Sequence, residues 1–214
     1  MAIKKDWIVG QDYNSTKEKL TNLRKRLVVN QIATPLTVDT YETHAKIALE
    51  VSDLDTFIQC FPVLVSLYKR GLPGHVQEFT AYSILYHLSM KQKDQYEKII
   101  GSILTNDLKH EAIDHAIQTC KAVEAGKYKE LFGLYLKSPN LNECLLEPLI
   151  PQMRLTAIKQ ILAKHKTCPI TALTTELNFK NEEECSTFLT EHKYSIQYGC
   201  LVRPPKPPKN TNKE

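Results

Sequence analysis

The sequence predicts an all-α array of paired helices, followed by a small C-terminal subdomain in which helices are combined with a β-hairpin. Three observations lead to this fold class. Apolar residues recur at helical spacing along most of the chain, and two helix pairs echo one another at a fixed offset. After residue 167 the pattern changes to short helices and an alternating strand.

The first predicted pair of helices lies between Thr37 and Tyr82. One apolar stripe at spacings i, i+3, i+4 and i+7 defines its second helix, and this stripe consists of Leu54, Phe57, Ile58, Phe61, Val65 and Tyr68. Ser52 is expected to cap that helix, with Asp55 three residues later completing a capping box.

Helix-breaking residues occur both within the same predicted helix and at its end. Pro62 removes an internal hydrogen bond, so the helix either kinks there or breaks and restarts at Val63. Gly71-Leu72-Pro73-Gly74 ends the helix, and a third periodic run begins near Gln77.

An internal repeat supports a helical array. Residues 48–54 align with residues 122–128 at an offset of 74, which is two units of roughly the length of a TPR-like helical hairpin. Further helices are expected over 15–28, 77–90, 96–104 and 107–123, and from Tyr128 onward, with Ala125-Gly126 as a C-cap signal. Such repeats bury their apolar faces by stacking on their neighbours.

The C-terminal third has the element order of a winged helix. A helix led by Pro151 runs over 152–165, and shorter helices are expected over 170–177 and 181–192. Residues 194–198 alternate like a strand, and residues 200–202 pair back on them after Gly199. The expected divisions are an N-terminal extension (1–13), TPR-like helical repeats (14–148), a winged helix (149–202) and a disordered basic Pro/Lys tail (203–214).

Composition and charge restrict the class of protein. The net charge of +4 divides into +4 for residues 1–35 (seven Lys/Arg, three acids), +3 for the last twelve residues (four against one) and −3 for the remainder (17 against 20). No apolar run approaches a membrane span, and the N-terminus lacks a signal-peptide pattern. The six cysteines contain no CxxC pair and are expected to be reduced, in the cytosol or nucleus.

Catalytic and metal-binding signatures are absent from the sequence. His110 and His115 resemble a zincin motif, but they are five residues apart and would face different sides of a helix, whereas shared ligation needs i, i+4. There is no GxxxxGK[ST], GxGxxG or GxSxG. We therefore expect no enzyme, no metal and no cofactor.

An ordered set of short motifs carries a family resemblance. These are Pro35-Leu36-Thr37-Val38, VDTYETHAKIALE over 38–50, Ser66-Leu67-Tyr68, Leu72-Pro73-Gly74 and Glu78-Phe79-Thr80-Ala81-Tyr82. The set resembles the SAC/GANP family of PCI-domain proteins, in its THP-type and leukocyte-receptor-cluster branch. The resemblance is strongest over 27–86 and continues more weakly to about residue 202.

The resemblance implies a PCI domain in a non-catalytic scaffold. It implies a nuclear complex that couples transcription to mRNA processing, including splicing and export. The implied partners are a second PCI protein, paired through winged helices, and a small acidic Sem/Dss-type subunit that contacts mainly that protein. The alternative is a structural subunit of a proteasome-lid, COP9-signalosome or translation-initiation particle with no nucleic-acid role.

Basic residues form the first candidate site. The helix over 152–165 and the following residues carry cations without an acidic counterpart in sequence, and the tail continues them; the set is Arg154, Lys159, Lys164, Lys166, Arg203, Lys206 and Lys209. A solvated basic face explains them equally well, whereas the functional alternative is non-specific binding of RNA or DNA phosphates. Arg24, Lys25 and Arg26 are second-rank candidates, also explained by favourable charge at a helix C-terminus.

The winged helix supplies the second candidate site. Glu182-Glu183-Glu184 lies at the start of the helix that would enter a DNA groove, where it would repel phosphate; helix capping explains it as well. Base-specific reading is therefore disfavoured. We expect instead a partner-binding surface that comprises Phe188, Tyr194, Ile196 and Tyr198.

Overall fold

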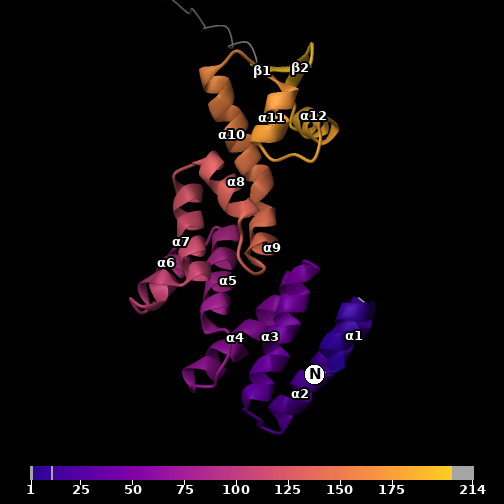
Figure 1. Ribbon diagram of the computed structural model, residues 1–214, viewed down its shortest axis with the longest axis vertical. Helices are drawn as coiled ribbons and strands as arrows, with labels where there is room; N and C mark the ends of the chain where they lie inside the picture. The colour runs from indigo at the N-terminus through magenta and orange to yellow at the C-terminus, as the bar shows by residue number, and fades with distance from the viewer. Residues whose placement is uncertain (1, 11, 204–214) are drawn as a thin grey trace, which may run out of the picture. The chain divides into compact units, whose positions relative to one another are not determined.

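The computed structural model describes residues 2–10 and 12–203, which are mostly helical and include one small antiparallel sheet (Figure 1). The chain divides into two compact units. The first comprises Met1–Gln118 and Ser138–Pro148, and the second comprises Thr119–Lys137 and Leu149–Glu214. Lys206 and Lys209, together with most of the tail expected to be disordered, lie outside the described residues.

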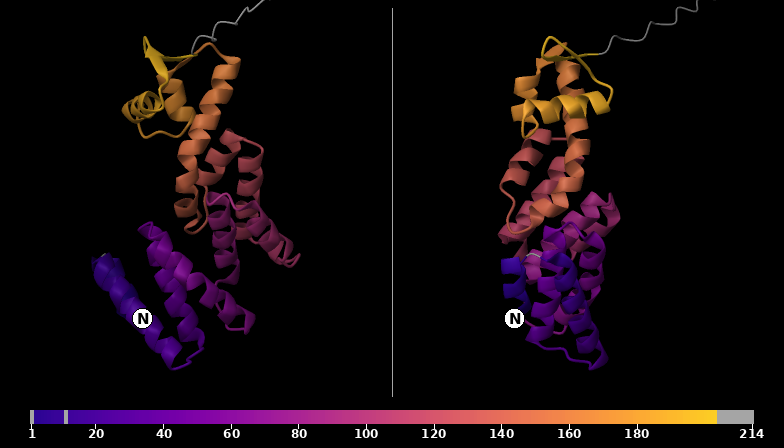
Figure 2. Two further views of the ribbon diagram at one scale, coloured as in Figure 1. Left: turned by 180° about the vertical axis from the view of Figure 1, so that it is seen from behind. Right: turned by 90° about the vertical axis from the view of Figure 1, so that its right-hand side faces the viewer.

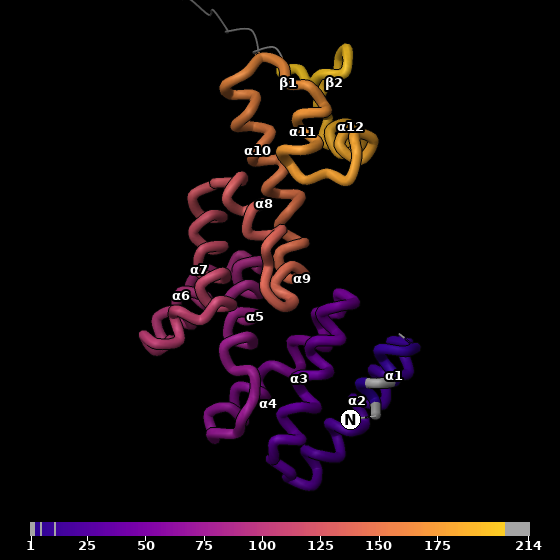
Figure 3. Tube along the Cα trace, viewed as in Figure 1, coloured from indigo at the N-terminus to yellow at the C-terminus, as the bar shows by residue number. Residues whose placement is uncertain are grey.

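Antiparallel helices connected by tight turns build the first unit (Figures 1 and 3). They are α1 (Ala2–Gly10), α2 (Tyr13–Val29), α3 (Pro35–Glu50), α4 (Leu54–Lys69), α5 (Val76–Ser89), α6 (Lys93–Gly101), the 3-10 turn η1 (Asp107–Lys109), the first part of α7 (Glu111–Glu124) and α9 (Asn142–Leu146). α3 packs closely on α4 and also contacts α2, so it forms the centre of this unit.

The two segments that align at an offset of 74 residues end their helices with the same backbone turn. After α3 the amide of Asp53 donates to the carbonyl of Ala48, and after α7 the amide of Lys127 donates to that of Ala122. The residue before each donor adopts a left-handed conformation, with φ of 59° at Ser52 and 63° at Gly126. This is the Schellman ending of a helix. The turn after α5 has the same pattern, and these turns are consistent with the helical repeat predicted from the sequence.

One local expectation for α4, the N-cap, is wrong, and of the two alternatives for Pro62 the break is excluded. The N-cap is Asp53, whose side chain accepts a hydrogen bond from the amide of Thr56 at 3.0 Å, whereas Ser52 is in the left-handed turn and cannot cap. Pro62 neither breaks nor ends the helix, which is continuous over Leu54–Lys69. Its ring lies on the exposed side, where the lost amide donor leaves the Ile58 carbonyl open to solvent.

The buried face of α4 is also rotated from the predicted stripe. Phe57 is buried as expected, but Ile58 is 36% exposed, and the fully buried set continues with Cys60, Leu64 and Leu67. Phe61, Val65 and Tyr68 are half-buried. The reason is that α4 has two neighbours: it packs on α3, while the Tyr68 ring lies 6.4 Å from that of Phe79 on α5.

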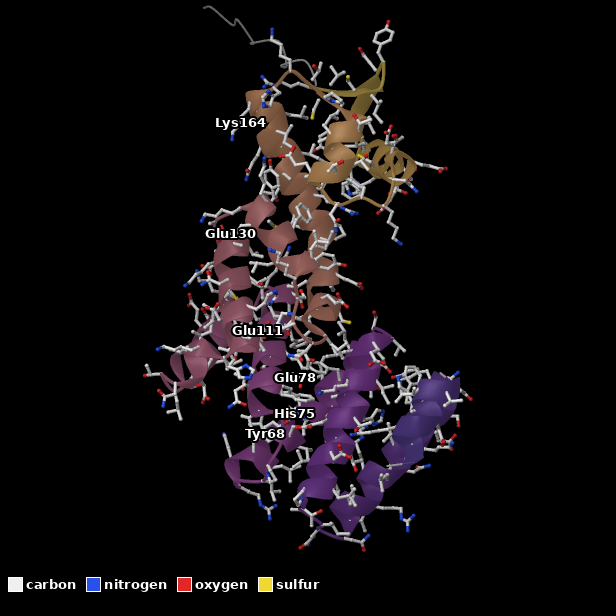
Figure 4. All side chains as sticks on the ribbon, viewed as in Figure 1. Tyr68, His75, Glu78, Glu111, Glu130 and Lys164 are labelled. Carbon is white, nitrogen blue, oxygen red and sulfur yellow. The ribbon has the colours of Figure 1, made fainter. Side chains whose placement is uncertain are left out.

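A buried carboxylate connects α3, α4 and the start of α5. Glu42 accepts hydrogen bonds from the Tyr68 hydroxyl and the His75 amide, both at 2.7 Å, and lies 2.6 Å from His75 Nδ1. Figure 4 shows the labelled Tyr68 and His75 near one another. A Cβ on Gly74 would come within 2.5 Å of Glu42 Oε1 and 2.6 Å of Val38. The motif Leu72-Pro73-Gly74 therefore needs its glycine for close approach of the backbone.

A second buried carboxylate lies in the first turn of α5. Glu78 accepts from Lys46 Nζ at 2.8 Å and from the Tyr82 hydroxyl at 2.6 Å. The same hydroxyl accepts the amide of Leu141 at 3.1 Å, just before α9. Burial and the bond to Glu78 raise the pKa of Tyr82, so it remains a neutral donor. These contacts fix α3, α5 and α9 to one another.

Within the second unit, residues 150–202 have the winged-helix-like order of elements that the sequence predicted (Figure 2). Its elements are the end of α7, α8 (Tyr128–Leu136), α10 (Ile150–Lys164), β1 (Thr167–Pro169), α11 (Ile170–Glu176), α12 (Glu182–Glu191), β2 (Ser195–Gln197) and β3 (Cys200–Val202). The antiparallel sheet has the order β1-β3-β2, and Leu201 pairs with Cys168 on one side and Ile196 on the other. β1 was not predicted, because three residues are too few to show alternation.

One apolar core holds the second unit together. Buried side chains of α8, α10, α11, α12 and β3 form a single cluster, with Leu173, Cys185, Leu189 and Leu201 inaccessible to solvent. In the part of the chain that the structure describes, no helix is long and apolar enough to cross a membrane.

Candidate nucleic-acid and partner interface

The basic residues predicted on α10 do not share one face. Pro151 occupies the first turn of the helix, where its missing amide costs nothing, and the helix ends at Lys164. Lys166 therefore lies beyond the helix, on the link to β1, and does not extend the helix face that carries Lys159. Lys159 is exposed one and a half turns before Lys164.

Three cations gather where α10 ends and the sheet begins. The amide of Arg203, which follows β3, donates to the Lys166 carbonyl at 2.9 Å, and Arg203 Nη2 donates to the His165 carbonyl at 3.1 Å. Figure 4 labels Lys164 at the end of α10. Lys164 and Lys166 are exposed and form no ion pair among the described residues. We call Lys164, Lys166 and Arg203 the basic edge.

An open hollow of about 400 Å³ adjoins the basic edge, between α8, α10 and β1. Its wall contains Glu176, which pairs with Lys129 Nζ at 2.8 Å and accepts the Tyr128 hydroxyl at 2.8 Å. The bond from Lys129 lowers the pKa of Glu176, so this acid is ionised and already neutralised by a neighbour. The unpaired positive charge beside the hollow therefore belongs to Lys164 and Lys166.

The side chain of Arg154 makes structural contacts within the second unit. Its guanidinium donates to the carbonyls of Leu177 at 3.1 Å and Asn178 at 2.5 Å, and pairs with Glu184 at 3.2 Å. Its Cζ lies 3.7 Å from the centre of the Phe179 ring. The side chain is 12% exposed. The expectation that Arg154 lacks an acidic counterpart is wrong, because its partner is thirty residues away in sequence and arrives with α12.

Asn181 caps α12, and the three glutamates occupy the first turn of that helix. Asn181 accepts the amide of Glu184 at 2.8 Å, and Glu184 in turn accepts the amide of Lys180 at 2.7 Å while it pairs with Arg154. Glu182 and Glu183 are exposed in the same turn. The capping explanation is thus confirmed, and these charges still oppose phosphate at this end of α12.

The four residues predicted to bind a partner differ in exposure. Phe188, Tyr194 and Ile196 are half-buried and pack against the core cluster of the second unit. Phe188 also contacts His192, with ring centres 4.3 Å apart. Tyr198 alone is fully exposed, at the tip of the β2–β3 hairpin with φ of 50°.

The three N-terminal cations differ in burial. Arg24 is buried at 8% exposure, and its Nη1 lies 2.8 Å from Cys60 Sγ, so it is not available to a phosphate backbone. Lys25 and Arg26 are exposed. Sequence reasoning could not separate them, because all three residues occupy successive positions near one helix end.

The histidines that resembled a zinc motif do not form a site. His115 is buried, and its Nδ1 lies 3.0 Å from the side-chain Nδ2 of Asn142. His110 lies before α7, and its Nδ1 accepts the amide of Ala112. Among the residues described, no group of three or more His, Cys, Asp or Glu is placed to hold a metal ion.

Together these features define a helical-repeat protein that ends in a winged-helix-like unit. The chain belongs to the SAC3/GANP family, whose model matches residues 22–198. It is 37% identical over 189 residues to a leukocyte receptor cluster member 8 homologue of Xenopus laevis, covering 87% of this chain and 24% of that protein. It is 33% identical over 187 residues to a THP3 homologue of Schizosaccharomyces pombe, covering 87% and 47%.

Protein THP3 of Saccharomyces cerevisiae is 26% identical over 185 residues, covering 84% of this chain and 39% of that protein. The chain thus spans between about a quarter and a half of the length of these curated relatives. The family and its THP-type branch, inferred above from short motifs, are confirmed.

Proposed function

We propose that this chain is a non-catalytic PCI scaffold subunit of a nuclear complex that couples transcription to mRNA processing and export. The family match over most of the chain supports this proposal, together with the relatives named as THP3 proteins. The helical repeats would carry partner contacts, and the winged-helix-like unit would complete the PCI domain. A chain of this family would act in the nucleus.

The second unit would pair with the winged helix of another PCI protein. Tyr198 supports this assignment, because a fully exposed aromatic ring at a hairpin tip costs hydration energy that an interface would recover. Ile196 and Tyr194 precede it in chain order and would form the half-buried base of the contact. A small acidic subunit of the Sem/Dss type would join mainly through that partner.

Nucleic acid would bind non-specifically at the basic edge, and the unpaired Lys164 and Lys166 are the observation that carries this part of the proposal. Cations without acidic partners break no ion pair when they bind phosphate, and their binding releases counterions from the nucleic acid. Lys206 and Lys209 lie three and six residues after Arg203 in sequence and would extend the contact. Arg154 is left out, since its donors are already used.

A binding titration tests the basic edge. Fluorescein-labelled single-stranded RNA of about 20 nucleotides is titrated with the whole chain and with K164E/K166E. We expect at least a tenfold loss of affinity and a smaller dependence of affinity on salt, because two phosphate contacts are removed.

The matched control is K98E/K109E, which makes the same charge change at exposed lysines of the first unit. This control should bind within about twofold of the wild type if local contacts, not net charge, hold the RNA. An unchanged affinity for K164E/K166E, or an equal loss in both variants, would remove the basic edge as the binding site.

A further inference from the structure

A groove runs between α2 and α4 in the first unit, with α3 beneath it. It consists of two open hollows of about 340 and 400 Å³, which share Val28 and Tyr41. α2 supplies one wall. Gln59, Val63 and Leu67 of α4 supply the other.

The groove exposes apolar surface along the end of α2. Val28 is 59% exposed, Val29 is 79% exposed, and Ile32, just after the helix, is 42% exposed. Single exposed apolar side chains are ordinary on protein surfaces, but here three lie within five residues and line one depression. Such a surface fits the apolar side chains of a bound segment.

A buried cation without a counter-charge lies in the wall of this groove. Arg24 lines the first hollow, with its Cζ 5.5 Å from the centre of the Tyr41 ring and its Nη1 donating to Cys60 Sγ. Its Nε is buried and has no hydrogen-bond partner. No carboxylate of the described residues pairs with it. Arg24 is too deeply buried to pair directly with an incoming anion, but its uncompensated charge adds to the positive potential of the groove.

Further positive charge lies along the same groove. Lys25 lines the first hollow and Arg70 the second, both are exposed, and neither forms an ion pair with any described residue. Neither hollow is lined by Asp or Glu. The electrostatic field of the groove is therefore positive, over an apolar floor.

We propose that this groove binds a short acidic segment of a partner protein, in which apolar side chains alternate with Asp or Glu. The apolar side chains would cover Val28, Val29 and Ile32, while carboxylates would pair with the exposed Lys25 and Arg70. The chain's own tail from Arg203 does not fit, because it holds four cations and one acid. Nucleic acid fits less well, because its phosphates gain nothing from the exposed valines.

A peptide selection tests this docking site even though the partner is unidentified. A phage library of random 16-residue peptides is selected on the whole chain, and the best peptides are synthesised with a fluorescent label. We expect peptides that combine Asp or Glu with Leu, Ile or Phe. They should lose at least tenfold in affinity for K25E/R70E and, separately, for V28S, and should weaken as salt rises.

Controls separate the groove from general charge and from unfolding. The exposed-site variant K98E/K109E should bind the same peptides within about twofold, and all variants should keep the wild-type melting temperature. V28S changes an exposed side chain and no charge, so it remains informative if K25E/R70E fails to fold.

Three results would overturn the proposal. One is a selection without acidic and apolar enrichment, and another is equal affinity of the selected peptides for wild type and V28S. The third is a labelled RNA whose binding is lost in K25E/R70E but retained in K164E/K166E, which would assign the groove to nucleic acid.

Discussion

Replacing Arg154 by alanine should destabilise the winged-helix-like unit rather than weaken a nucleic-acid contact directly. The guanidinium donates to two carbonyls at the end of α11 and pairs with Glu184 in the first turn of α12. One side chain therefore holds both helices against α10. It also covers the ring of Phe179. Its removal leaves the Leu177 and Asn178 carbonyls without their donors.

The size of the effect follows from these contacts. A hydrogen bond to a charged group contributes roughly 1.5 to 3 kcal/mol, and a desolvated cation–π contact about 2 kcal/mol. These contributions do not add fully, since the Glu184 side chain is 37% exposed and regains water when its partner is lost. We expect a loss of about 3 kcal/mol, near the lower end for breaking a largely buried ion pair.

Hydrogen exchange read by mass spectrometry is the suitable assay. The single tryptophan, Trp7, lies in α1 and reports on the first unit only. Peptides covering 152–203 should exchange about a hundredfold faster in R154A, because 1.4 kcal/mol corresponds to a factor of ten. K159A, an exposed change on the same helix, should exchange at the wild-type rate.

Exchange of R154A at the wild-type rate would refute this structural role. If R154A also weakened RNA binding as much as K164E/K166E, Arg154 would be a phosphate contact, as the sequence pattern first indicated.

Four further substitutions have outcomes that follow from local geometry. Gly74→Ala should lower the unfolding free energy by about 2 to 3 kcal/mol in urea melts, because its Cβ would overlap a buried carboxylate; Gly133→Ala, where α8 leaves open space, should raise it by up to about 1 kcal/mol. Pro62→Ala should stabilise by about 1 kcal/mol, since it restores an amide donor to Ile58 on an exposed side. Burial, followed by nearby cations, lowers the pKa of His44 to about 4, so the unfolded chain binds the proton more readily and stability falls as pH drops from about 6.5 to 4. His44→Gln should remove about 2 kcal/mol of the difference in stability between pH 7.5 and pH 5, as measured by denaturant midpoints.

Local signals predicted most of the fold. Helix periodicity and the glycines at the ends of helices identified the array. A Schellman turn needs a residue in the left-handed conformation, and that residue is often a glycine, as at Gly71 and Gly126. Ser52 shows where this fails. Its neighbour Asp53 is also a good cap, and only the turn geometry decides which of the two residues caps α4.

Long-range contacts account for what the sequence could not show. β1 exists because Thr167, Cys168 and Pro169 pair with β3 more than thirty residues later, and no pattern of three residues announces that pairing. Arg154 precedes the buried Ala157 and Ile158 by three and four residues, so it borders the apolar face of α10, and that spacing could have indicated a packed role. Its partner Glu184 could not be identified without the fold.

The most direct test of the scaffold proposal is a native purification of the tagged whole chain from its own cells at low and moderate salt. Co-purifying proteins and RNA are identified at each salt concentration. We predict a stoichiometric second PCI protein that stays bound at moderate salt and is lost in a Tyr198→Ser variant, and RNA that is released as salt rises. Stoichiometric proteasome-lid or initiation-factor subunits, with no RNA at either salt concentration, would contradict the scaffold proposal.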